Sequence, residues 1–115
     1  MSLYTPDCWQ IIKIQAPGHD PYYRILAGWS GSYLEGASWK LSSGIESFID
    51  FGDHYLSDQS SGSVYKIYKT RERMSGIMAG VFTTYSEQAT DQGWTFEVIP
   101  LEDFLKEYNG KIESI

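Results

Sequence analysis

Up to about Met74, apolar side chains along the chain alternate with polar ones or come in short runs rich in Ile, Tyr and Trp. This two-residue period and these residue types favour β-strands, and the Gly, Pro, Ser and Asp between them favour turns. We expect Tyr33 and Leu34 to start a short hairpin that returns through Ser38–Leu41. The predicted strands cover residues 8–15, 22–29, 38–41, 45–51, 54–59 and 64–70.

After Met74 the pattern changes to the spacing of an amphipathic helix. Apolar residues stand at positions 74, 77, 78, 81, 82 and 85, which predicts a helix over about 74–88. Alternation returns at 94–99 and predicts a last strand. Pro100 suits a first helical turn, so a second helix is expected over about 100–109, before Asn109-Gly110 ends it. The final residues, 111–115, are expected to fray or to extend a sheet edge.

This order of elements predicts an α+β fold. The expected architecture is a bent, mainly antiparallel sheet of about five to seven short strands, with both helices on one face. The alternative is a small, partly open β-barrel, because the glycine-rich strand breaks would also let a sheet curl. No repeat or linker-like segment interrupts the pattern, so residues 1–115 are expected to form a single globular domain.

Composition limits the class of protein further. The chain has 42% hydrophobic and 21% charged residues, which is typical of a folded domain and not of a disordered chain. No apolar run is long enough to span a membrane, so no membrane partner is expected. The start of the chain lacks the pattern of a signal peptide, and the lone Cys8 cannot form an internal disulfide. These features predict a cytoplasmic protein.

Charge is unevenly distributed. The net charge is −6, yet residues 64–73 carry four Lys or Arg against one Asp or Glu, whereas the rest of the chain carries five against fourteen. An acidic chain lacks the broad positive field that drives non-specific binding to nucleic acid. Only the segment 64–73 could therefore serve a phosphate backbone.

Enzyme chemistry has two weak candidates. His19-Asp20 and Asp53-His54 each place an imidazole beside a carboxylate, a pairing that could bind a divalent metal if the two pairs met in space. Cys8 with one of these histidines could form a nucleophile and its base. Turn formation by Asp and Gly, and burial of Cys8 in an apolar strand, explain the same residues without any chemistry. No catalytic, cofactor or metal residue is therefore assigned.

The segment 64–73 is the best local candidate for binding. It combines cations that attract phosphate with rings that can stack on bases. An edge strand kept soluble by its charges, or a surface that docks on an acidic partner, would show the same pattern. The residues concerned are Tyr65, Lys66, Tyr68, Lys69, Arg71 and Arg73.

The aromatic residues suggest an interaction surface as well. Four Trp exceed what a core of this size requires, and exposed Trp and Tyr are favoured at protein interfaces. Within the stretch 22–44, where rings alternate with Gly and Ser, the candidates are Trp29, Tyr33 and Trp39. Rings that the two helices leave uncovered would mark the interaction face.

The run YRILAGWSGSYLEGASWKLSSGI, together with HYLSDQSSGSVYKIYK, resembles small uncharacterised proteins of tailed bacteriophages, particularly T4-like and cyanophage-type ones. The resemblance covers about half of the chain and rests on a cadence of Trp, Gly and Ser. It implies a viral protein made in the host cytoplasm, and it carries no activity to any residue.

Three functions of different classes follow. The leading hypothesis is a non-enzymatic interaction or accessory module that binds a protein partner, or itself, through an aromatic sheet surface. The alternative is a nucleic-acid-binding accessory protein that uses the segment 64–73. The second alternative is a small hydrolase or metal-dependent enzyme around His19, Asp20, Asp53 and His54.

Overall fold

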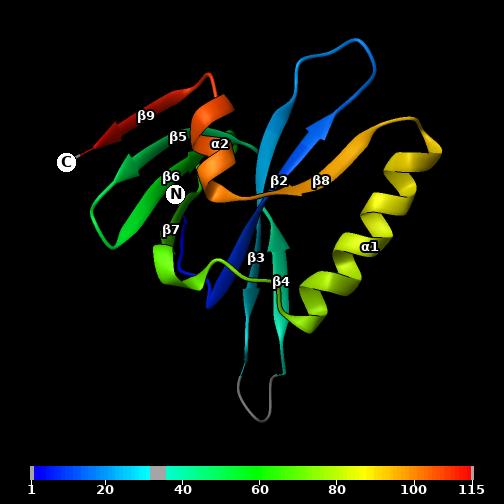
Figure 1. The fold of residues 1–115 in the computed structure, drawn as a ribbon. Helices are drawn as coiled ribbons and strands as arrows, with labels where there is room; N and C mark the ends of the chain where they lie inside the picture. The colour runs from blue at the N-terminus through cyan, green and yellow to red at the C-terminus, as the bar shows by residue number, and fades with distance from the viewer. Residues whose placement is uncertain (1, 32–35, 115) are drawn as a thin grey trace.

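The computed structural model describes residues 2–31 and 36–114, which form two β-sheets, two α-helices and one short 3-10 helix (Figure 1). The five-stranded sheet has the order β1-β7-β6-β5-β9 and consists of β1 (Leu3–Tyr4), β5 (Ile45–Asp50), β6 (His54–Gln59), β7 (Val64–Tyr68) and β9 (Lys111–Ser114). The four-stranded sheet has the order β4-β3-β2-β8 and consists of β2 (Cys8–Gln15), β3 (Tyr22–Trp29), β4 (Ser38–Leu41) and β8 (Thr95–Ile99). The helices are η1 (Lys69–Arg71), α1 (Gly76–Asp91) and α2 (Leu101–Glu107).

The four-stranded sheet is covered on both faces, which explains the nearly continuous apolar run of β2. Ile11 lies opposite Ile25 of β3 and Ile99 of β8, and all three belong to one core cluster. Ile12 and Ile14 point the other way, into a second cluster. Successive side chains of a strand point to opposite faces of the sheet. A strand that lies between two layers must therefore be apolar at odd and even positions alike.

The main core lies between the two sheets. Trp9 and Ile11 reach it from the four-stranded sheet, and Phe48 and Ile67 reach it from the five-stranded sheet; all four are fully buried. The indole nitrogen of Trp9 also donates a 2.8 Å hydrogen bond to the carbonyl of Tyr68. This bond joins β2 to the end of β7, and it satisfies a polar group that burial would otherwise leave unpaired.

Helix α1 covers the other face of the four-stranded sheet, away from the five-stranded sheet (Figure 1). The hydroxyl of Ser75 accepts a hydrogen bond from the Met78 backbone N–H and caps the first turn. Met78 is fully buried against Cys8 and Leu26. A Cβ at Gly28 would lie 2.5 Å from the sulfur of Met78, so a side chain at this position would force Met78 to move.

Helix α2 packs against the opposite face of the four-stranded sheet, the face that turns towards the five-stranded sheet. Phe104 is fully buried and forms aromatic contacts with Tyr23 of β3 and Phe48 of β5, with ring centroids 5.1 and 4.9 Å apart. Tyr108, just after the helix, donates a 3.2 Å hydrogen bond from its hydroxyl to the carbonyl of Ile45. Helix α2 therefore belongs to the core that joins the two sheets.

The α+β class with two helices is confirmed, and the strands expected at 8–15, 22–29 and 38–41 have the predicted bounds. Helix α1 begins two residues later than expected, because Ser75 caps it, and it continues to Asp91. The part of the hairpin predicted at Tyr33 and Leu34 lies outside the described residues.

The arrangement of these elements differs from the single bent sheet with both helices on one face. The chain forms two sheets, and α1 and α2 lie on opposite faces of the four-stranded one. The barrel alternative is also corrected, because the described strands form two sheets with separate edges. Parallel pairing of β1 with β7 and of β9 with β5 makes the five-stranded sheet mixed. Among the described residues, no helix is long and apolar enough to cross a membrane.

Candidate interaction surface

The five-stranded sheet has one face turned away from the core, which we call the outer face. Its residues follow from the register, since paired residues point to the same side of a sheet: Leu56 lies opposite both Lys66 and Ile49, and Leu3 lies opposite Val64. The apolar and aromatic part of the outer face comprises Leu3, Ile49, Phe51, His54, Leu56, Val64 and Tyr68, with Lys66 among them. The same register adds Asp58 beside Val64, Glu113 beside Ile49 and Lys111 beside Ser47, so charged residues border this part.

The outer face is apolar along its middle and open to solvent. Leu3 is 63% exposed and Phe51 is 40% exposed, whereas Ile49, Leu56 and Val64 are partly exposed. Both helices pack elsewhere, α1 on the other sheet and α2 on the inner side, so no helix among the described residues covers this face. An exposed apolar strip bordered by charged residues is typical of a binding surface.

Three rings follow one another along one end of the outer face. The rings of Phe51 and His54 are stacked, with an interplanar angle of 4° and ring centroids 5.2 Å apart. The ring centroids of His54 and Tyr68 are 5.7 Å apart. Two cations flank the last ring: Lys66 Nζ is 5.1 Å and Arg71 Cζ 4.8 Å from the Tyr68 centroid. Cation–π attraction holds these long side chains against the ring and positions their charges at the surface.

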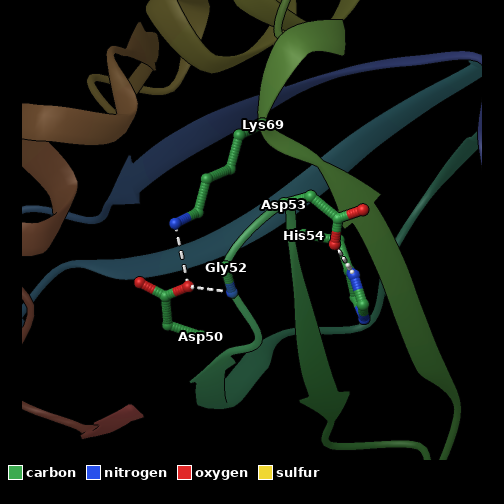
Figure 2. Close-up of polar contacts among 5 residues, drawn as sticks. All are labelled: Asp50, Gly52, Asp53, His54 and Lys69. Atoms are coloured by element: carbon green, nitrogen blue, oxygen red, sulfur yellow. Dashed lines mark hydrogen bonds and ion pairs between the residues drawn. The ribbon is translucent and has the colours of Figure 1, made fainter. Parts of the chain in front are cut away.

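The turn between β5 and β6 is tied to the end of β7 by an ion pair (Figure 2). Lys69 Nζ lies 2.8 Å from Asp50 Oδ1, and the same oxygen accepts a 2.8 Å hydrogen bond from the backbone N–H of Gly52. These two donors stabilise the carboxylate and lower the pKa of Asp50. The charge of Lys69 is therefore already balanced within the protein.

A second carboxylate stands in the same turn. Asp53 Oδ1 accepts a 2.5 Å hydrogen bond from His54 Nδ1, which lowers the pKa of Asp53 (Figure 2). The Asp53 side chain is largely exposed, and the imidazole lies between Phe51 and Tyr68. The pair orients the ring of His54 within the aromatic row, which is a positioning role.

The residues expected to bind through the segment 64–73 separate in the structure. Lys66, Tyr68 and Arg71 gather at the outer face. Tyr65 points to the core with 1% exposure, so its ring is not available to a partner. Arg73 is exposed beyond η1, and its backbone N–H donates to the carbonyl of Trp9. Alternation along β7 explains this division, because Tyr65 and Lys66 must face opposite sides.

Trp29 and Trp39, two of the three aromatic candidates of the first half of the chain, do not lie at the outer face. Trp29 is partly buried, donates a 3.1 Å hydrogen bond to the carbonyl of Thr5 and packs against the main core. Trp39 is exposed on the four-stranded sheet, where it meets Tyr85 of α1 edge to face. Tyr33 lies outside the described residues.

The enzyme candidates are not assembled into a site. No group of three His, Cys, Asp or Glu among the described residues is arranged to hold a metal ion. His19 lies in the turn between β2 and β3 and His54 in the other sheet. Cys8 is buried, with its sulfur 3.4 Å from the sulfur of Met78. These surroundings favour packing over nucleophilic chemistry.

Sequence analysis missed Phe51, His54 and Leu56 as members of the surface. A usable signal was present: only the short tract 60–63 separates the strands predicted at 54–59 and 64–70, and a hairpin turn there sets His54 opposite Tyr68, as observed. Continuing that register would have placed the three residues beside Lys66 and Tyr68. The outward direction of this face, in contrast, depends on where the second sheet packs.

Comparison with known proteins finds no matching family model, no similar curated protein and no similar solved structure.

Proposed function

We propose that this chain is a non-enzymatic interaction module that binds a protein, either a different one or a second copy of itself, through the outer face of the five-stranded sheet. The observation that carries the proposal is an apolar sheet face with flanking rings that neither helix covers. Protein interfaces combine an apolar centre with aromatic and Arg side chains, and the outer face has this composition.

The local charge favours a protein partner over a phosphate backbone. Of the four cations in the segment 64–73, Lys69 is paired with Asp50, and Lys66 and Arg71 share one tyrosine ring. Asp53 and Asp58 stand exposed on the same hairpin. The positive field of the segment 64–73 is therefore weaker than its count of cations indicates. The exposed apolar side chains of the outer face, in contrast, have no such compensation.

A protein partner can be tested with a photo-reactive residue in place of Phe51. The full chain carrying benzoylphenylalanine at position 51 should cross-link to a defined protein, or to a second copy, in the cells that naturally express it. The same group in place of Thr84, exposed on α1, serves as the matched control. Light scattering at several concentrations reports self-association.

A second substitution separates specific binding from adventitious cross-linking. Leu56→Glu places a charge in the middle of the outer face and should abolish both the cross-link and any self-association, whereas Thr84→Glu should leave them intact. Thermal unfolding checks that both variants fold. A strictly monomeric chain without a cross-link from position 51, or a cross-link indifferent to Leu56→Glu, would contradict the proposal.

A second candidate is binding of single-stranded nucleic acid, favoured by the row of Phe51, His54 and Tyr68 with two flanking cations. Bases stack on such rings, and Lys and Arg attract the phosphates. Fluorescence anisotropy of a labelled single-stranded oligonucleotide tests it. Lys66→Gln and Arg71→Gln should each weaken binding and lower the salt slope by about 1, whereas Lys106→Gln on α2 should not. Binding that ignores salt would exclude this candidate.

The biological setting that we propose is an accessory role in the cytoplasm, in a phage-infected host. The resemblance of the Trp, Gly and Ser cadence to small phage proteins supports this setting. It adds no chemistry to the outer face.

A further inference from the structure

A groove lies away from the outer face, between the end of α1 and the four-stranded sheet. It has a volume of about 310 Å³, a size at the lower end of small-molecule sites. The last two turns of α1 form one wall, and β3, β2 and the start of β8 form the other. The groove shares no lining residue with the outer face.

Four aromatic side chains line the groove together with Ile14, Leu41 and Ala89. Tyr22 is 40% exposed and Trp94 is 39% exposed, although both line the groove. Tyr85 and Phe96 complete it, with ring centroids 5.8 Å apart. Exposed rings beside a groove offer flat surfaces on which a planar ring can stack.

One cation lies among these rings, and the lining contains no carboxylate. Arg24 lines the groove with its guanidinium carbon 5.6 Å from the Tyr22 centroid. Its Nε is buried and has no hydrogen-bond partner, and no carboxylate among the described residues forms an ion pair with it. A buried guanidinium nitrogen without an acceptor is destabilising, so the Nε of Arg24 is a donor that the described residues leave unsatisfied.

We propose that this groove binds a small planar aromatic anion, whose ring stacks on Tyr22 and Trp94 and whose carboxylate or phosphate accepts hydrogen bonds from Arg24. A guanidinium matches the planar geometry of both anions. Charge complementarity selects the occupant: in a chain of net charge −6, this groove presents a cation with no lining acid beside it. An aromatic cation would be repelled, and a neutral ring would leave Arg24 unpaired.

The test compares three probes that share planar rings and differ in charge. Indole-3-acetate represents the carboxylate, adenosine monophosphate the phosphate, and tryptamine the same indole ring with a positive charge. Calorimetric titration into the full chain should give a Kd of about 1 mM or tighter for at least one anion and no binding of tryptamine. The anion that binds identifies the acidic group. Failure of both anions, or equal binding of tryptamine, overturns the proposal.

Substitutions assign the binding to the groove. Arg24→Met keeps the length of the side chain and should weaken the anion at least tenfold, whereas Arg71→Met, at the outer face, should leave its affinity unchanged. Trp94→Phe should keep binding and remove part of the ligand-induced quenching of tryptophan fluorescence. If Arg24→Met does not fold, Arg24→Lys replaces it and should weaken binding through loss of the planar fork. Unchanged affinity in the folded Arg24 variant overturns the proposal.

Discussion

The hydroxyl of Tyr23 donates a 2.7 Å hydrogen bond to Oε1 of Glu107, and this bond joins β3 to α2. Lys13 Nζ lies 2.8 Å from the same carboxylate oxygen. The three groups come from β3, α2 and β2, so the cluster fastens the helix to the four-stranded sheet. Both donors favour the ionised carboxylate, and they lower the pKa of Glu107.

Glu107 should make the protein sensitive to acid. Because its pKa is lower in the folded state than the ordinary value of 4.5, its contribution to stability is present above pH 4.5 and is lost as the pH falls through the folded-state pKa. We expect the free energy of unfolding to fall less steeply in Glu107→Gln than in the wild type between about pH 5 and pH 3. Urea unfolding at several pH values measures it. Parallel pH profiles would contradict the assignment.

Loss of the hydroxyl should destabilise the protein at Tyr23 but not at Tyr65, although both tyrosines are buried. Tyr23→Phe removes the bond to Glu107, which is partly exposed, and should cost about 1 kcal/mol in the free energy of unfolding. Tyr65→Phe removes a buried hydroxyl that has no hydrogen-bond partner among the described residues, so its stability should stay within about 0.5 kcal/mol of the wild type or rise. Urea unfolding at neutral pH decides, and a larger loss for Tyr65→Phe would contradict the prediction.

Tyr65 should also limit the stability of the protein at alkaline pH. Burial raises the pKa of Tyr65 to about 12, above the ordinary value of 10.0. The unfolded chain ionises first, so this contribution is complete below pH 10 and is lost as the pH rises towards 12. Tyr65→Phe should show a smaller fall in melting temperature over that range than the wild type. An identical fall in both proteins would count against it.

Ser42 should contribute through one hydrogen bond. Ser42 is buried just after β4, and its hydroxyl accepts a 2.8 Å hydrogen bond from the backbone N–H of Ile25. The hydroxyl oxygen thus takes the place of the backbone carbonyl that a longer β4 would offer to this N–H. Ser42→Ala leaves that buried N–H unpaired and should cost about 1–3 kcal/mol. Ser43→Ala is the matched control: its hydroxyl accepts only an exposed bond from Ser61, so its cost should stay below about 0.5 kcal/mol. Equal losses in chemical unfolding would refute this difference.

Gly28 should be required for the close approach of α1. A Cβ at this position would lie 2.5 Å from Met78 Sδ, although the backbone angles there suit any residue. Gly28→Ala should therefore cost about 1–3 kcal/mol by overpacking. Gly80→Ala, on the open side of α1, should instead stabilise the helix by about 0.5–1 kcal/mol.

A double substitution tests the cause. Because the clash is with Met78, the cost of Gly28→Ala should shrink when Met78→Ala is already present, and the two losses should not add. Additive losses in thermal or urea unfolding would mean that the strain at Gly28 has another origin.

Much of the local structure could be predicted because hydrophobic period is a property of neighbouring residues. The apolar run of residues 8–15, the alternation of 22–29 and the stripe after Met74 each determine one element without reference to any other. The same reasoning placed Lys66 and Tyr68 in one binding segment. It could not show that Tyr65 faces inward, because alternation gives two faces and leaves open which of them is covered.

The sequence by itself determined the α+β class, nearly all of the strands and both helices, together with an unusual concentration of cations at 64–73. Tertiary structure decided the rest: the division into two sheets, the parallel edge strands β1 and β9, the pairing of Lys69 with Asp50, and the aromatic row at Phe51, His54 and Tyr68. These features join residues far apart in the chain. Which sheet arrangement forms depends on the apolar surface that each competing arrangement buries and on the entropy lost in closing its long loops. A local sequence pattern contains neither quantity.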